Sequence, residues 1–218
     1  QPFSIAGKKQ GFSDPKRGYL FYKILELIDI KNPNTIILEN VKNLEKINDG
    51  HTFNIIYKEL TNRDYHVSYK VLDSKYYNSP QSRKRIYIIC TKNKKYEFKD
   101  IKNEYVPVSK IIDKTENKYF DYLEKYNLER IINKKSLIKY KLINKKTGKG
   151  GRQGERVYSI NNYGPTICAT SGGPGSKTGL YEIDGNIRKL NINESIQMFG
   201  FNENFKFNSL KNKNKIIY

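Results

Sequence analysis

A carboxylate and an amide follow a short apolar run early in the chain, in the order Glu39, Asn40, Val41. The run before them, Ile36-Ile37-Leu38, is typical of a buried strand, and open α/β sheets bind ligands beyond the carboxyl ends of their strands. Glu39 stands at such a strand end, so its carboxylate is a candidate for contact with a ligand. Position alone also allows a structural interpretation, in which the carboxylate caps the helix that follows.

Two arginines stand two residues apart in the segment QSRKRIYIIC, directly before a second apolar run. Side chains two apart share one face of an extended segment, so Arg83 and Arg85 could together hold a phosphate or an oxygen on a base edge. The alternative is a solvated charge cluster at the start of a strand.

The elements that must position these side chains follow from hydrophobic spacing. Helical spacing runs from Arg17 to Ile30 and again from Thr52 to Thr61, and β-like segments follow at HVSYKVLDS and RIYIIC. Strands that alternate with helices predict an α/β sheet with some parallel pairing.

The chain is strongly basic, since 41 Lys and Arg residues against 22 Asp and Glu residues give a formal net charge of +19 at pH 7. This surplus favours a polyanionic partner, most simply nucleic acid, although the abundant Lys and Asn also fit the codon bias of an AT-rich genome. Two cysteines and two histidines are too few for a disulfide framework or a zinc site, so no metal is expected. No apolar run reaches membrane length and no signal peptide is visible, which predicts a soluble protein of a reducing compartment such as the cytoplasm.

The chain changes character after Lys92, where charged and Asn-rich segments of weak periodicity replace the α/β pattern. A Gly-rich region follows from GKGGRQGERVYS, and RKLNINESIQMFGF then shows a capping-box spacing, Asn191 to Glu194, with Gly200 as a helix stop. We predict three parts: an α/β part in residues 1–100, a basic irregular domain in residues 101–187, and a returning segment in residues 188–218 that packs on the α/β part.

The motifs, taken in order, closely resemble the DNA cytosine-5 methyltransferases of bacterial restriction–modification systems, the HhaI-type members most of all. The resemblance covers nearly the whole chain and rests on QPFSIAGKKQGF, RGYL, LENVKNL, PQSRKRIY, GERVYS, PTICAT and RKLNINESIQMFGF. It implies part of a Rossmann-like S-adenosylmethionine-dependent methyltransferase sheet and a small, mostly β or irregular, target-recognition domain. The implied activity is methyl transfer from S-adenosylmethionine to carbon 5 of a cytosine flipped out of a specific duplex site, in protection of host DNA.

The resemblance also implies roles at the matching positions of the catalytic part. Glu39 would hold N3 and the amine of the flipped cytosine and share a proton with N3, as a carboxyl at a buried strand end can, with Asn40 in support. Arg85 would contact the cytosine oxygen, and Arg83 would lie near the nucleophile and a phosphate. Leu20 matches a cofactor-side residue.

Contacts to double-stranded DNA are implied for a closing loop at the start of the chain and for two recognition loops. Gln153 falls near the position of a residue that fills the hole left by the flipped base, with a one-residue insertion at Arg152, and Arg156 matches an arginine that reads a base. The implied DNA-binding residues are Gln1, Ser4, Lys8, Lys9, Gln153, Arg156, Thr166, Thr170 and Gly173. Between residues 134 and 156, one acid, Glu155, stands among nine basic residues: Lys134, Lys135, Lys139, Lys141, Lys145, Lys146, Lys149, Arg152 and Arg156.

The nucleophile of this family is the Cys of a Pro-Cys-Gln-x-Phe-Ser motif, and the sequence begins at the Gln of that motif. The resemblance therefore implies a fragment that lacks N-terminal and C-terminal segments of the same enzyme and is inactive alone. Cys90 fits a core residue and Cys168 lies in a recognition loop, so neither replaces the nucleophile. SGGPGSKTG is not a phosphate-binding loop, because Ser176 stands where that motif needs Gly and no buried strand leads into it.

Three interpretations stay open. The first is the methyltransferase itself. The second is a non-catalytic DNA-binding subunit of a split methyltransferase. The third is an RNA-directed relative, which the sizeable Gly-rich recognition region disfavours.

Overall fold

The computed structural model of the chain describes residues 19–116, 119, 121, 124–133, 136–168 and 172–205. The expected DNA contacts Gln1, Ser4, Lys8, Lys9 and Thr170 lie outside these ranges. The chain divides into two compact units, the first formed by residues 1–73 and 84–100, the second by residues 74–83 and 101–218. The predicted division into three parts is a different one and stays a prediction.

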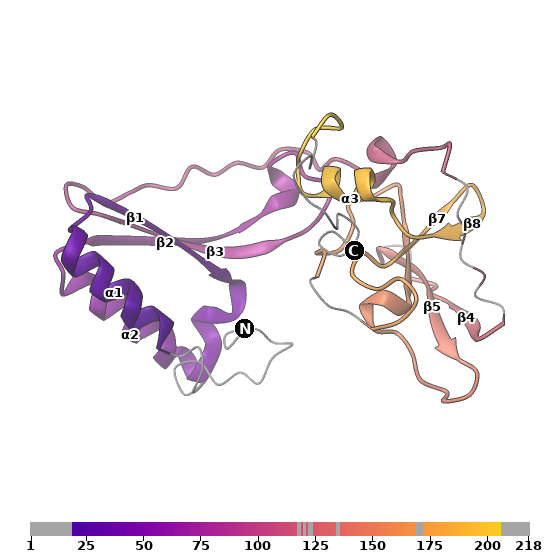
Figure 1. The fold of residues 1–218 in the computed structure, drawn as a ribbon, viewed down its shortest axis with the longest axis horizontal. Coiled ribbons are helices and arrows are strands. Elements are labelled where there is room, and N and C mark those ends of the chain that lie inside the picture. The colour runs from indigo at the N-terminus through magenta and orange to yellow at the C-terminus, as the bar shows by residue number, and fades with distance from the viewer. Residues whose placement is uncertain are drawn as a thin grey trace. The chain divides into compact units, whose positions relative to one another are not determined.

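The first unit is a small α/β layer structure. In its described residues, two helices lie together on one side of a three-stranded sheet (Figure 1). Its helices and strands are α1 (Leu20–Lys31), β1 (Thr35–Val41), α2 (His51–Thr61), β2 (His66–Asp73) and β3 (Lys84–Thr91). Each corresponds to an element that hydrophobic spacing predicts, and the α/β fold class is confirmed.

The strand order is β1-β3-β2, and β3 pairs antiparallel with both neighbours. The expectation of parallel pairing is therefore wrong for this sheet. Strands β1 and β2 run in the same direction, because helix α2 connects them. They are not hydrogen-bonded to each other, because β3 lies between them and runs in the opposite direction.

The core of the first unit lies between the helices and one face of the sheet. Alternate residues of β3, which are Ile86, Ile88 and Cys90, are buried there, opposite Ile36 and other apolar side chains of β1. The helices contribute apolar residues at helical spacing, namely Phe21, Leu25, Ile28, Phe53, Ile56 and Leu60. Cys90 is the core residue that the sequence predicts, and burial raises the pKa of its thiol to about 11.

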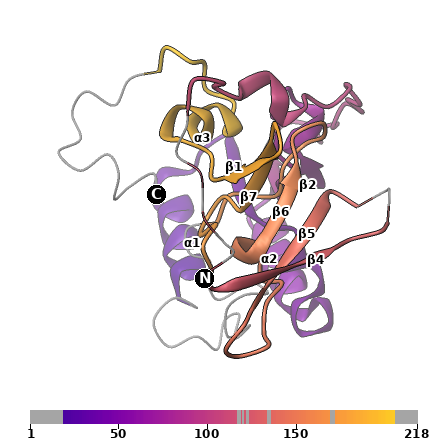
Figure 2. The ribbon, with the colours of Figure 1, turned by 90° about the vertical axis from the view of Figure 1, so that its right-hand side faces the viewer.

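The second unit is built around a five-stranded sheet in the order β4-β5-β6-β7-β8, accompanied by the short helix α3 (Figure 2). Neighbouring strands pair antiparallel except β6 and β7, which are parallel. The elements are β4 (Tyr126–Arg130), β5 (Ile138–Asn144), β6 (Arg156–Ser159), β7 (Leu180–Ile183), β8 (Asn186–Arg188) and α3 (Ile192–Met198). None of the described helices is long and apolar enough to span a membrane.

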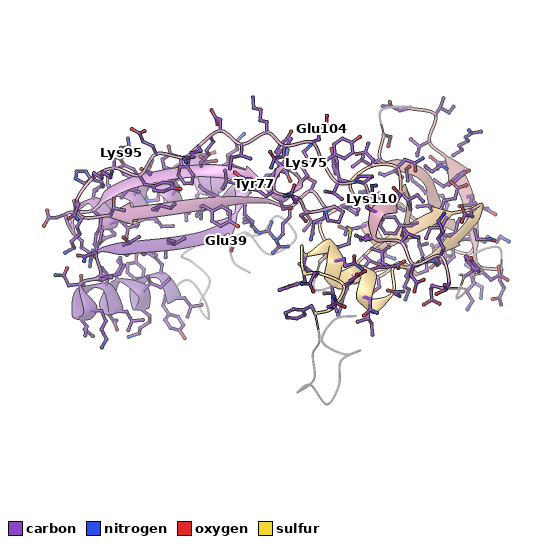
Figure 3. The ribbon with its side chains drawn as sticks, turned by 90° about the horizontal axis from the view of Figure 1, so that it is seen from above. Glu39, Lys75, Tyr77, Lys95, Glu104 and Lys110 are labelled. Atoms are coloured by element: carbon purple, nitrogen blue, oxygen red, sulfur yellow. The ribbon has the colours of Figure 1, made fainter. Side chains whose placement is uncertain are left out.

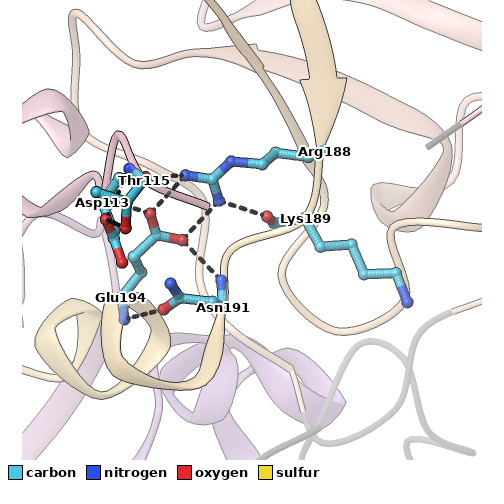
Figure 4. Close-up of polar contacts among 6 residues, drawn as sticks. All are labelled: Asp113, Thr115, Arg188, Lys189, Asn191 and Glu194. Atoms are coloured by element: carbon cyan, nitrogen blue, oxygen red, sulfur yellow. Dashed lines mark hydrogen bonds and ion pairs between the residues drawn. The ribbon is translucent and has the colours of Figure 1, made fainter. Parts of the chain in front are cut away.

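A buried ion pair joins β8 to the start of α3 (Figure 4). Arg188 and Glu194 are each 1% exposed, and their side chains meet through Nη1–Oε2 at 2.8 Å and Nη2–Oε1 at 2.7 Å. Burial lowers the pKa of the Arg188 guanidinium, but the hydrogen bonds to Glu194 and the attraction of the negative charges of Glu194 and Glu116 together outweigh burial and raise the pKa. The predicted capping box is confirmed, since Asn191 accepts from the Glu194 N–H and donates its own N–H to the Glu194 carboxylate.

The connection between β2 and β3, residues 74–83, belongs to the second unit rather than to the sheet that it leaves. Gln81 is 1% exposed, donates from Nε2 to the Met198 carbonyl at 2.5 Å and accepts from the Ile167 N–H at 3.2 Å. Ser79 also donates to the Met198 carbonyl, at 2.9 Å. These bonds hold residues 74–83 against the end of α3 and against the loop that precedes residue 168.

Candidate functional site

Glu39 and Arg85 form an ion pair on the face of the first sheet that the helices leave uncovered. In the β1–β3 register Glu39 lies opposite Tyr87 and Arg85 lies opposite Val41, so the two side chains are diagonal neighbours on one face. The distance from Arg85 Nε to Glu39 Oε1 is 2.9 Å. The Glu39 side chain is 45% exposed and that of Arg85 is 18% exposed. The pair therefore holds the carboxylate in one orientation and leaves it partly exposed.

The carboxylate projects from the C-terminal half of β1 (Figure 3), within the strand rather than after it. The Glu39 side chain is exposed there, because the face that carries it has no covering helix in the described residues of the first unit, and its expected contact with N3 of cytosine stays a prediction. Asn40 points to the other face of β1, and its Oδ1 accepts from the Val41 N–H at 2.8 Å. The expected support of Glu39 by Asn40 stays a prediction.

Arg83 and Arg85 fall in different units, although they are two residues apart. Arg85 lies in β3, and Nη1 of its guanidinium donates to the Lys84 carbonyl at 2.8 Å. Arg83 ends the 74–83 connection, where its carbonyl accepts from the Ser74 N–H at 3.3 Å. The expected phosphate contact of Arg83 stays a prediction.

Arg156, the expected base-reading arginine, begins β6 at the end of the Gly-rich turn. Its Nε donates to the Gly151 carbonyl at 2.6 Å, so the plane of the guanidinium is set by the backbone of its own turn. Arginine can donate in parallel from its terminal nitrogens to the two acceptors of a guanine. The geometry is compatible with this use of Arg156.

Gln153 connects two loops instead of projecting from one. Its Nε2 donates to the Thr166 carbonyl at 2.6 Å and to the Lys177 carbonyl at 3.3 Å, and its Oε1 accepts from the Cys168 thiol at 3.4 Å. Thr166 in turn donates from Oγ1 to the Ser82 carbonyl at 2.6 Å. The structure thus brings Gln153 and Thr166 together, as the sequence motifs suggest, but uses their polar groups within the protein.

An ion pair that the motif comparison did not single out lies in the same turn. Arg152 donates to the carboxylate of Glu155, and the bonds to Arg152 lower the pKa of Glu155 against the effect of its burial. Gly173, at φ +92°, packs against this carboxylate: a Cβ on it would lie 2.5 Å from Glu155 Cγ. The signal in the sequence was the position of Glu155 as the one acid among nine basic residues.

Two lysines of the basic stretch lie in the exposed turn after β5. The Asn144 side chain accepts from the backbone N–H groups of Lys146 and Thr147, at 3.0 and 3.1 Å, which fixes the turn. Lys145 and Lys146 are both exposed. Lys134 and Lys135 lie outside the described residues. Exposed lysines on an ordered turn are suited to phosphate contacts.

Leu20 is the residue that the sequence motifs assign to the cofactor side. It begins α1 and is 49% exposed. An aliphatic side chain offers only van der Waals contact, and the expected contact of Leu20 with S-adenosylmethionine stays a prediction.

Comparison with known proteins identifies the family. A family model described as C-5 cytosine-specific DNA methylase matches residues 1–217. The Type II methyltransferase M.HhaI of Haemophilus parahaemolyticus is 32% identical over 217 residues, which cover 94% of this chain and 64% of the relative. The Type II methyltransferase M.Bsp6I of a Bacillus species is 34% identical over 209 residues, which cover 93% of this chain and 65% of the relative. The chain thus spans slightly less than two thirds of the length of these relatives.

Solved structures agree at the level of the fold. An Entamoeba histolytica methyltransferase, EhMeth, superposes with a TM-score of 0.65 at 17% identity and covers all of this chain and 68% of its own. The Dnmt2 methyltransferase of S. pombe gives a TM-score of 0.62 at 18% identity, over all of this chain and 69% of its own. The matched family model and the curated relatives together show that this chain belongs to the C-5 cytosine-specific DNA methylase family.

Proposed function

We propose that this chain is part of a DNA cytosine-5 methyltransferase of a restriction–modification system, which methylates carbon 5 of a cytosine within a specific duplex site. The observation that carries the proposal is the Glu39–Arg85 pair, a half-exposed carboxylate held at 2.9 Å by a guanidinium on an open sheet face. Membership of the C-5 cytosine-specific family supports it. S-adenosylmethionine would supply the methyl group when bound, and Leu20 is the residue of this chain that we expect to contact it.

Carbon 5 of cytosine becomes nucleophilic when a thiolate adds to carbon 6, because the ring electrons are then released toward carbon 5 and N3. Glu39 would donate or hold a proton at N3 and so stabilise the charge that develops there. Arg85 would keep the carboxylate oriented through Nε and contact the cytosine oxygen through a terminal nitrogen. An oriented carboxylate stabilises the transition state more than a mobile one does, because it need not reorganise during the reaction.

The thiolate does not come from either cysteine among the described residues. Cys90 is fully buried in the core of the first unit, where burial raises the pKa of its thiol to about 11. Cys168 donates to Gln153 within the second unit. We therefore expect the nucleophile from another part of the enzyme.

The second unit would provide the contacts to DNA. A cytosine inside the stack cannot be reached at carbons 5 and 6, so the proposed reaction requires base flipping. The net charge of +19 and the lysines of the turn after β5 favour phosphate contacts, and Arg156 offers a base contact.

The test is a pair of substitutions in an active enzyme that contains these 218 residues. Glu39→Gln keeps the shape but removes the acid, and should lower kcat by about 100-fold or more, the scale of lost general-acid help. Glu59→Gln is the matched control, since Glu59 is 37% exposed and also paired with an arginine, Arg63 at 2.7 Å. Incorporation of labelled methyl groups into duplex DNA is measured for both.

The proposed role is wrong if Glu39→Gln and Glu59→Gln turn over at the same rate. Binding of cognate duplex by Glu39→Gln should remain, because the carboxylate acts on the reacting base. Specific binding of duplex by this chain, combined with methyl transfer that Glu39→Gln leaves unchanged, would instead favour the non-catalytic DNA-binding subunit of a split methyltransferase.

A further inference from the structure

Three charged side chains form a row across strands β4, β5 and β6. In the antiparallel register, Lys141 lies opposite Glu129 on one side and opposite Arg156 on the other. Residues directly opposite each other in such pairs project from the same face of a sheet. Their neighbours in the chain pack in an apolar cluster on the other face: Leu128, Leu142 and Val157. The row therefore points away from that cluster.

The Gly-rich turn between β5 and β6 touches both cations of the row at one backbone position, Gly151. The Gly151 carbonyl accepts from Arg156 Nε at 2.6 Å. A Cβ on Gly151 would lie 3.4 Å from Lys141 Cδ, so the turn also contacts the aliphatic stem of the lysine. The turn thus holds the guanidinium of Arg156 and the stem of Lys141 next to each other.

Stability of the sheet does not account for a lysine beside Arg156, because like charges directly opposite each other destabilise neighbouring strands. Glu129 offsets part of this repulsion, since its Oε1 lies 3.4 Å from Lys141 Nζ. The side chains of Lys141 and Glu129 are 39% and 55% exposed, and exposed ion pairs are weak because water and salt screen them. Lys141 can therefore exchange Glu129 for another acceptor at little cost.

The spacing of the two cations fits neighbouring base pairs of a duplex. Adjacent strands lie about 4.8 Å apart and successive base pairs about 3.4 Å apart, so the row matches one base-pair step more closely than two. Lysine and arginine side chains only donate hydrogen bonds. Their commonest specific partner is guanine, which presents the acceptors O6 and N7 in a major groove wide enough for a β-ribbon.

On the basis of the proposed function, we infer that Lys141 reads a guanine in the base pair next to the one that Arg156 reads, by donating to its O6 and N7. Glu129 holds the ammonium in the row until DNA binds. Lys145 and Lys146 differ from Lys141, because they lie in the exposed turn after β5 and suit phosphate contacts. Lys141 lies within β5, so its position is set by the sheet.

The test uses an enzyme that contains these 218 residues. Its site is mapped by selection of bound duplexes from a randomised library, and binding is then measured to the selected duplex and to variants of each base pair. Lys141→Met keeps the stem and removes the ammonium. Lys146→Met is the matched control, because Lys146 is an exposed lysine of the same unit that we expect to hold a phosphate. Arg156→Ala identifies the base pair that Arg156 reads.

The wild-type enzyme should prefer guanine at the neighbouring pair by about tenfold or more, within the range of a good base contact. Lys141→Met should reduce this preference to less than about threefold and keep the preference that depends on Arg156. Lys146→Met should weaken binding to all duplexes by the same factor.

A second measurement needs no substitution in the protein. When 7-deazaguanine, which lacks the N7 acceptor, replaces that guanine, the wild-type enzyme should bind about threefold or more weakly. Each comparison is a ratio of affinities within one preparation, so it does not depend on the fraction of folded protein.

The inference is overturned if Lys141→Met leaves every preference unchanged, or weakens every duplex by the same factor as a lost phosphate contact would. It is equally wrong if the preference that Lys141→Met loses is not next to that of Arg156, or if the wild-type enzyme binds guanine and 7-deazaguanine alike at that pair. Failure of the proposed function would show itself separately, as absence of methyl transfer by a wild-type enzyme that still binds the selected duplex.

Discussion

Removal of the buried charge on Glu194 should destabilise the second unit severely. Its carboxylate accepts from Arg188 Nη1 and Nη2, from the Asn191 N–H at 2.6 Å and from the Asp113 N–H at 2.8 Å. Glu194→Gln offers one oxygen to these donors and leaves the buried Arg188 guanidinium without the carboxylate that pairs with it. Breaking a buried ion pair from one side costs about 3–5 kcal/mol.

Such a loss is a large fraction of the stability of an ordinary domain, about 5–15 kcal/mol. With a urea m-value of about 2 kcal/mol/M, the midpoint should fall by about 1.5–2.5 M. The assay is urea unfolding of the 218-residue chain followed by circular dichroism. Glu129→Gln is the matched control, because Glu129 forms an exposed pair with Lys141 in the same unit and should cost less than about 1 kcal/mol.

A second variant separates the charge from the hydrogen bonds. Arg188→Met combined with Glu194→Gln removes the unpaired charge and retains an acceptor for the two backbone N–H groups, so it should recover at least half of the loss. The reasoning is refuted if Glu194→Gln unfolds at the same urea concentration as Glu129→Gln, or if the double variant is less stable than Glu194→Gln.

Two further predictions concern the recognition turn. In an active enzyme, Arg156→Ala should abolish the preference for one base pair of the site, a loss of about 1–3 kcal/mol of discrimination. Lys145→Ala combined with Lys146→Ala should instead weaken binding to all duplexes alike. It should also reduce the slope of log affinity against log salt concentration by about one unit per phosphate contact. Binding to the cognate duplex and single-pair variants at two salt concentrations distinguishes them, and equal weakening of every duplex by Arg156→Ala would make Arg156 a backbone contact. Because the pKa of Glu155 is lower in the folded chain than its ordinary value of 4.5, its ion pair should contribute stability in full above pH 4.5 and lose it as the pH falls below that value. Urea midpoints measured from pH 7 down to pH 3 should show this decline in the wild-type chain and less of it in Glu155→Gln.

The sequence by itself determined the elements of the first unit and the family. Apolar spacing located α1, α2 and the three strands because burial on one face imposes its own period on the chain, 3.6 residues for a helix and two for a strand. The family followed from the order of motifs along the chain. The capping box at Asn191 and Glu194 was also readable, since all of its partners lie within four residues.

Tertiary structure decided what depended on partners distant in the chain. Glu39 is exposed rather than buried because it lies on the face of the sheet that points away from the helices. On that face its neighbour is Arg85 of β3. The direction of β3 between β1 and β2 is set by a connection that packs on the second unit through Gln81. The amide of Gln153 is used by loops that only the fold brings to it. Contacts of this kind produce no regular spacing in the sequence, because the two residues of each contact are far apart in the chain and come together only when it folds.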